Sequence, residues 1–252
     1  MKITFRCDPA LLATLQKPVL ARHALPDWLR AMPRAAHSQT HGQDVRTVKQ
    51  CPPFVDAMAH GFMMTLPCDV SVSGGALSWD WDRPPLTVEA HPQSPISFHV
   101  PEQVTGTPFH DPDAVVVKFN SFWTIALEPG YALYATHPVN RADLPFRTLS
   151  GLVDSDRFND VGILFPALWT DPAFEGTLKR GTPVAQCFPV AREPLALSFD
   201  AFTPQEAARY ASTAQALLSG PGVYRKGFRV RRGRTEGGAQ GARTEPEPPA
   251  RL

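Results

Sequence analysis

Short runs in which apolar and polar residues alternate recur along most of this chain. Alternation with a period of two places the apolar side chains on one face, as in a half-buried β-strand. Strands are therefore predicted at residues 2–7, 62–66, 69–73, 76–81, 86–90, 96–100, 114–120, 123–127, 131–136, 152–153, 162–169 and 184–190. Their short length and close spacing predict a mainly β fold, a sandwich or a barrel.

Turn residues separate these runs. Gly74-Gly75 joins two alternating runs and predicts a hairpin, and Pro129-Gly130 suits a type II turn. Residues 176–181 are expected to form a connection. Residues 34–44 are polar and are expected to form a solvated loop that carries two histidines.

Three segments favour helix. Residues 26–33 are bounded by prolines and predict a short helix, and residues 54–60 predict a helical turn that ends at Gly61. A longer helix is expected at 204–218, because Thr203 opens a capping box with proline at the first helical position.

The same patterns divide the chain into four parts. Residues 1–44 are expected to pack a strand and a short helix on a β domain at residues 45–195. Residues 196–232 are expected to add the C-terminal helix and a basic arm. Residues 233–252 are rich in Gly, Pro, Glu and Arg and predict a disordered tail.

Composition narrows the function classes. The 25 basic and 24 acidic residues nearly balance, which argues against nucleic acid or an anionic membrane as partner. No basic stripe interleaves with the main aromatic set, which consists of Trp79, Trp81, Phe119, Phe122, Trp123 and Trp169. No apolar window approaches the roughly 18 residues that span a bilayer, so a soluble cytoplasmic protein is expected. The four cysteines lack the spacing of a zinc site or a disulfide framework and are interpreted as buried or free thiols, at Cys7, Cys51, Cys68 and Cys187.

Two glycine-led motifs lie within residues 144–192: Gly-Leu-Val-Asp-Ser-Asp at 151–156 and Gly-Thr-Pro-Val-Ala-Gln at 181–186. As an ordered pair they resemble the last conserved blocks of the dUTPase and dCTP deaminase superfamily, whose trimers have the β-clip fold. The resemblance implies a β-clip-like domain, a homo-oligomer, and hydrolysis of a nucleotide-like or phosphorylated ligand, with Mg²⁺ as the metal.

The resemblance also implies roles for particular residues. Asp154 matches the carboxylate that activates water, and Gln186 matches a residue near the phosphates. The phosphate-binding serine block is replaced by His137 to Arg141, which offers one cation, and Arg157 and Phe158 stand where a base-selecting tyrosine is expected. The catalytic candidates are Asp154, Asp156 and His137, and the ligand-binding candidates are Arg141, Gln186, Arg157 and Trp123.

A broader set of motifs spans residues 25–195. It consists of Cys-Pro-Pro-Phe at 51–54 with Asp-Ala-Met at 56–58, Pro-Gly-Tyr at 129–131, His-Pro at 137–138 and the two glycine-led motifs. This order resembles an uncharacterised bacterial and phage domain family. That resemblance implies no particular chemistry.

Three alternatives stay open at this point. A mononuclear iron enzyme would draw its ligands from His91, His99, His110, Asp111, Asp113 and His137. A cysteine nucleophile would be Cys51, if a helix N-terminus lies beside it. In a non-catalytic structural or assembly protein, Asp154 and Asp156 would only cap a turn.

Overall fold

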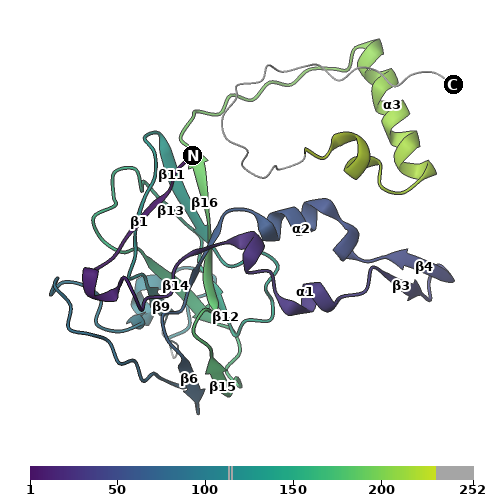
Figure 1. Ribbon diagram of the computed structural model, residues 1–252. Coiled ribbons are helices and arrows are strands. Elements are labelled where there is room, and N and C mark those ends of the chain that lie inside the picture. Colours follow the sequence, from purple (N-terminus) through teal and green to yellow (C-terminus); the bar gives the residue numbers. More distant parts are fainter. Residues whose placement is uncertain (113, 115, 231–252) are drawn as a thin grey trace. The chain divides into compact units, whose positions relative to one another are not determined.

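The computed structural model describes residues 1–112, 114 and 116–230 of the 252-residue chain. Two compact units are present, residues 1–197 and the residues from Ser198 onward. The first unit carries the strands, which form several antiparallel sheets, and few helices accompany them (Figure 1). The predicted mainly β fold is confirmed.

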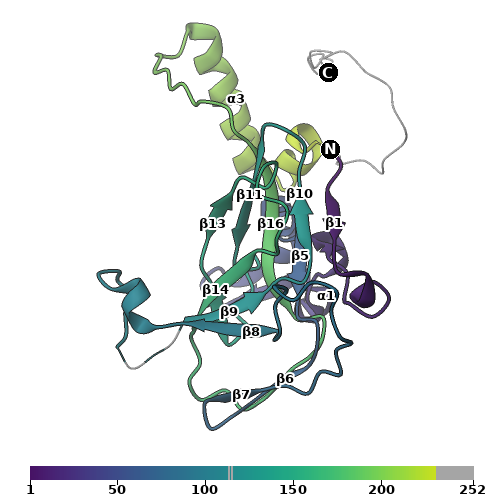
Figure 2. The ribbon, with the colours of Figure 1, turned by 90° about the vertical axis from the view of Figure 1, so that its left-hand side faces the viewer.

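Two sheets form the body of the first unit. The larger sheet has the strand order β13 (Gly151–Val153), β11 (Tyr131–Thr136), β16 (Pro183–Ala191), β5 (Phe62–Thr65) and β2 (Val19–Leu20). The second has the order β12 (Phe146–Thr148), β14 (Leu164–Trp169), β9 (Val116–Asn120) and β8 (Ile96–His99). Figure 2 shows the strands of the second sheet running across those of the first.

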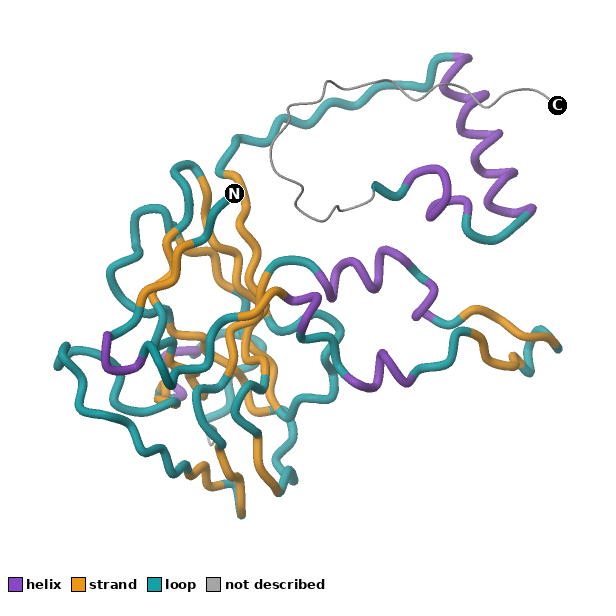
Figure 3. Tube along the Cα trace, viewed as in Figure 1, coloured by secondary structure: helices purple, strands orange, loops and turns teal. Residues whose placement is uncertain are grey.

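Smaller sheets and helices complete the described elements. The small sheets pair β1 (Thr4–Arg6) with β10 (Thr124–Ala126), β15 (Gly176–Leu178) with β6 (Val70–Ser73) and β7 (Ala76–Ser78), and β3 (Ala35–Ser38) with β4 (Gln43–Arg46). The α-helices are α1 (Asp27–Ala31), α2 (Pro52–Ala59) and α3 (Pro204–Ser219), and a π-helical turn covers Tyr224–Phe228. In the first unit, α1, α2 and the β3–β4 hairpin extend from one side of the strands (Figures 1 and 3).

One hydrophobic core joins the two main sheets. Phe119 on β9 is 1 % exposed and packs against Phe146 on β12, with their ring centroids 4.6 Å apart. Leu133 on β11 and Ala185 on β16 are fully buried in the same cluster. Burial alternates along β6, from Val70 to Ser73, as its sequence predicts.

The expected helices are confirmed. Helix α3 covers Pro204–Ser219, and the Thr203 hydroxyl and the Glu206 carboxylate form the predicted capping box. Helix α2 ends just before Gly61, whose φ is +71°. A Cβ atom at Gly61 would lie 2.1 Å from the Cys187 carbonyl oxygen, so this position requires glycine for space as well as for conformation.

Three sequence predictions were wrong. Residues 86–90 form no strand, because the Thr87 and Val88 amides donate instead to the buried Asp8 carboxylate, at 2.8 and 3.1 Å. Residues 34–44 are not a simple loop: most of them belong to the β3–β4 hairpin, whose side chains are largely exposed, so no apolar period marks it. The expected connection at 176–181 begins with β15, which pairs with β6.

The expected tail at residues 233–252 lies outside the described residues, as do the last two residues of the basic arm and Asp113. Strand β12 was not predicted. Its three residues are too few to show a period, and it pairs with β14 through tertiary contacts.

Candidate functional site

A cleft of about 1140 Å³ opens in the first unit where β11 ends. Its walls come from β11, β12 and β16, from Phe54 and His60 at α2, and from the loop after β11. That loop, residues 137–141, is the His137–Arg141 segment expected from sequence to bind an anion. The cleft therefore contains two of the predicted site residues, His137 and Arg141.

The loop at 137–141 has a fixed backbone. Asn140 has a φ of +59°, a left-handed conformation that asparagine tolerates better than most residues. The His137 ring is bonded at both nitrogens: the Thr148 amide donates to Nδ1 at 3.2 Å, and Nε2 lies 2.8 Å from the Arg141 carbonyl oxygen. These contacts assign the proton to Nε2 and hold the imidazole in its neutral form.

Electrostatics agree with a neutral His137. Burial lowers the pKa of His137, and the positive charges of Arg147 and Arg141 lower it further, against the opposite effect of its bond to the Arg141 carbonyl group. Since both ring nitrogens hold backbone groups, we assign His137 the role of positioning the loop. Its ring has no nitrogen left to accept a proton from a ligand.

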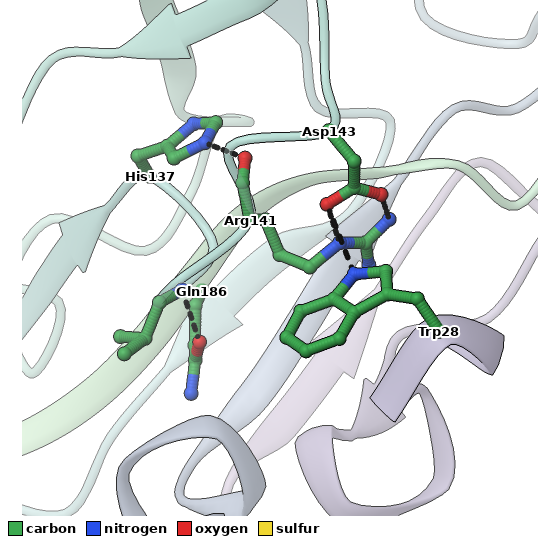
Figure 4. A network of polar contacts seen from close by, with 6 residues as sticks. Trp28, His137, Arg141, Asp143 and Gln186 are labelled. Carbon is green, nitrogen blue, oxygen red and sulfur yellow. Dashed lines mark hydrogen bonds and ion pairs between the residues drawn. The ribbon is translucent and has the colours of Figure 1, made fainter. Parts of the chain in front are cut away.

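Gln186 supports the loop from beneath. The side chain is fully buried, and its Oε1 accepts from the Val139 amide at 2.8 Å (Figure 4). Its Nε2 donates to the carbonyl oxygens of Ala57, Met58 and His60, at 3.0, 3.4 and 2.7 Å. One amide thus joins the loop to the end of α2, and Gln186 is not among the residues that line the cleft.

Arg141 is neutralised within the protein. Its guanidinium forms two hydrogen bonds of 2.8 Å with the Asp143 carboxylate, and its side chain is 11 % exposed. The indole of Trp28 on α1 donates to the same carboxylate at 3.3 Å (Figure 4). Burial acts against ionisation of Asp143, but the bonds and charge of Arg141 lower its pKa overall, so the pair stays charged.

Arg147 on β12 supplies the cleft with a second cation. Its side chain is exposed and lines the cleft. Among the described residues its guanidinium has no ion-pair partner, in contrast to Arg141. The charge of Arg147 is therefore available to an anionic ligand.

Three hydroxyl groups form a cluster on one wall of the cleft. Tyr134 and Thr136 lie on β11, and both hydroxyls bond to Ser150 Oγ, at 3.3 and 2.7 Å. Hydrogen bonding to the Ser150 and Thr136 side chains lowers the pKa of the Tyr134 phenol below its usual value. The three hydroxyls line the cleft and can donate to, or accept from, a bound polar group.

A row of rings continues this wall. Phe188 on β16 lies between His60 and Tyr134, with ring centroids 5.6 Å and 6.2 Å away. All three rings line the cleft. The wall thus offers flat apolar surface next to hydroxyl groups, which suits a ligand with a planar ring.

Asp154 and Asp156 lie elsewhere. They come after β13, at its far end from Ser150, and both carboxylates pair with the Arg192 guanidinium; the Asp154 contact is 2.7 Å long. The Gly130 amide, at the start of β11, donates to Asp156 at 3.0 Å. Neither aspartate lines the cleft, so the expected pocket that joins them to His137, Arg141 and Gln186 is not formed.

The remaining ligand-binding candidates are also outside the cleft. Arg157 is exposed in the turn after Asp156. Trp123 is 6 % exposed, and its indole donates to the Gln16 carbonyl oxygen at 2.9 Å, which anchors the N-terminal segment to the core. Cys51 is exposed at the start of α2 and does not line the cleft.

The histidines proposed as metal ligands do not converge where they are described. His91 stacks on Phe122, His99 bonds to Gln103, and His137 holds the loop. Within residues 1–112, 114 and 116–230, no group of three His, Cys, Asp or Glu side chains is placed to hold a metal ion. Asp113, another of the candidates, lies outside this range.

Sequence reasoning missed the groups that make the cleft chemically useful. Arg147, Tyr134 and Ser150 carry no motif of their own. The signal available was position: Ser150 directly precedes the first glycine-led motif, and Tyr134 and Thr136 share one face of a predicted strand.

Comparisons with known proteins do not assign this sequence to a family. Neither a scan against protein-family models nor a search of curated proteins found a match to this sequence. No helix in the described part of the chain is long and apolar enough to cross a membrane. The resemblance to dUTPases thus stays a prediction.

Proposed function

We propose that this protein binds a small anionic molecule with a planar ring, of the class that includes nucleotides, in the cleft at the end of β11. The observation that carries the proposal is the exposed Arg147 guanidinium, which has no ion-pair partner among the described residues and lines the cleft. An unpaired cation beside a concave wall favours an anionic group.

The wall formed by the rings and hydroxyl groups supports the same class of ligand. The rings of Phe188, His60 and Tyr134 offer a flat surface for a planar group, and the hydroxyls around Ser150 offer hydrogen bonds to a sugar or an acidic oxygen. Gln186 and His137 hold the loop in place before a ligand arrives, which reduces the entropy lost on binding.

Hydrolysis with Asp154 as base and Mg²⁺ as cofactor remains the finer prediction. Asp154 does not line the cleft, because its carboxylate pairs with Arg192 at the other end of β13. Binding and hydrolysis are therefore to be tested separately.

Binding is tested by titration calorimetry with nucleoside mono- and triphosphates, with and without Mg²⁺, alongside inorganic phosphate and the uncharged nucleosides. We expect the charged nucleotides to bind, and Arg147→Gln to weaken binding about tenfold or more, as expected for the loss of hydrogen bonds to a charged group. Arg46→Gln, an exposed arginine on β4, is the matched control and should bind as the wild type does.

Equal affinities of the Arg147→Gln and wild-type proteins would refute the proposed site, and no binding by any charged probe would refute the proposed class of ligand. Hydrolysis is read separately, as release of phosphate or diphosphate. Full release by Asp154→Asn would exclude Asp154 as the base and leave the binding proposal intact.

A further inference from the structure

A second cavity, of about 440 Å³, lies in the first unit beside the end of β1. Its walls are residues 6–9, residues of the segment 88–92, Phe122 with Thr124, and the loop at 159–162. None of these residues lines the cleft at the end of β11. The two sites are therefore separate, and a ligand of the second cavity is independent of the function proposed for the cleft.

The walls of this cavity are held by specific contacts. Asp8 is 4 % exposed, and its carboxylate accepts hydrogen bonds from the amides of Ala10, Thr87 and Val88 at 2.9, 2.8 and 3.1 Å. These bonds tie the N-terminal segment to the segment that carries His91. On the other side, a Cβ atom at Gly162 would lie 2.1 Å from a backbone carbonyl oxygen, so this loop packs directly on the core.

Two residues of the wall carry buried polar atoms without a partner. His91 Nδ1 and Thr124 Oγ1 are shielded from solvent, and neither has a hydrogen bond in the described structure. The His91 ring stacks on Phe122, with centroids 5.1 Å apart, which fixes the orientation of the imidazole plane. Both residues line the cavity, so a rotation of either side chain would bring an unsatisfied polar atom to its surface.

The charges around the cavity favour a cation. Arg6 contributes one positive charge, and Asp8 and Asp160 contribute two negative ones. Burial opposes ionisation of Asp8, but the hydrogen bonds from the three amides lower its pKa overall. Burial and the neighbouring Asp8 raise the pKa of the Cys7 thiol and keep this thiol neutral. Among the described residues, the exposed Asp160 carboxylate has no ion-pair partner.

We infer that this cavity binds a small organic amine with an apolar body. The ammonium group pairs with the exposed Asp160 carboxylate, and the body packs against the apolar side chains of Val88, Pro92 and Val161. An organic acid of the same shape would place a third negative charge in the cavity and is disfavoured.

The test compares three probes with one shape and different charge: benzylammonium, benzyl alcohol and benzoate. Binding to the full chain is measured by two-dimensional NMR of the ¹⁵N-labelled protein, with the Cys7, His91 and Gly162 amides as local reporters. We expect benzylammonium to bind tightest and benzoate weakest. Asp160→Asn should weaken benzylammonium binding about fivefold, the effect typical of a solvent-accessible ion pair.

Asp82→Asn changes a carboxylate outside the cavity and should bind as the wild type does. Val161→Trp places a large side chain in the cavity lining, from a half-exposed position, and should abolish binding without unfolding the protein. Benzoate binding as tightly as benzylammonium, an Asp160→Asn protein with wild-type affinity, or no shift of the reporters with any probe would each overturn the inference.

Discussion

Replacement of Gln186 by leucine tests how the cleft is built. Leucine is close to glutamine in volume but can neither accept from the Val139 amide nor donate to the carbonyl groups at the end of α2. Because Gln186 is fully buried, water cannot take its place without a rearrangement of the core. The change therefore removes the polar link between α2 and the cleft loop, while the volume of the buried side chain stays nearly the same.

The expected loss of stability comes from the groups left unpaired. Two of them, the Val139 N–H and the His60 carbonyl, lose contacts of 2.8 and 2.7 Å. A buried polar group without a partner costs about 1–3 kcal/mol, and both groups are partly buried, so we expect Gln186→Leu to lower the free energy of unfolding by about 3 kcal/mol. That is a large part of the roughly 5–15 kcal/mol typical of a folded domain.

Urea denaturation monitored by tryptophan fluorescence measures this loss. With a slope of about 2 kcal/mol per molar urea, the midpoint of Gln186→Leu should fall by about 1–2 M. Gln43→Leu, an exposed glutamine on β4, is the control and should shift the midpoint little. If Gln186→Leu unfolds at the wild-type midpoint with the wild-type slope, the side chain does not hold the loop and the reasoning fails.

Two further predictions concern backbone space and charge. Gly61→Ala should lower the free energy of unfolding, measured by urea denaturation, by at least about 3 kcal/mol, because its Cβ would overlap a carbonyl oxygen. Gly75 also has a positive φ but has open space around it, so Gly75→Ala should lower the free energy of unfolding by only about 1 kcal/mol. Equal losses in the two variants would contradict this prediction. Burial opposes ionisation of Asp156, but its contacts with the Gly130 amide and with Arg192 lower its pKa overall. The Asp156 carboxylate therefore stabilises the fold at pH values above its unfolded pKa of about 4, and this stabilisation is lost as the pH falls. Arg192→Gln should make the midpoint less sensitive to pH between about 5 and 3, and an unchanged pH profile would count against the pair.

The fold was predictable where the signal is local. Val70 to Ser73 alternates in sequence and in burial, and the capping box at Thr203 is complete within four residues. The 86–90 segment shows the limit. Its alternation suits a strand, but its amides bond to Asp8, about 80 positions away in the chain, and no local pattern reports such a partner.

The candidate site was predictable only in part, for the same reason. His137 and Arg141 lie in the polar segment after a strand and line the cleft, but their partners decide what they do. Asp143 neutralises Arg141, and the backbone contacts of Thr148 and Arg141 occupy both nitrogens of His137. The cation left available, Arg147, has nothing in its neighbouring sequence to distinguish it from the other arginines.

The two glycine-led motifs lie on either side of strand β11. This arrangement explains why Asp154, Asp156 and Gln186 do not share the one pocket that the sequence predicted. The first motif forms β13 on one side of β11, and the second leads into β16 on the other side. Strand β11 is six residues long, about 17 Å at the usual rise per residue. Asp156 bonds at the beginning of β11, whereas Gln186 pairs with Thr136 at its end, beneath the cleft loop. Because the length of β11 separates them, the aspartates stabilise one end of the sheet and the glutamine supports the cleft at the other. The motif carboxylates therefore line no part of the cleft, whose polar groups include Arg147 and the hydroxyls around Ser150.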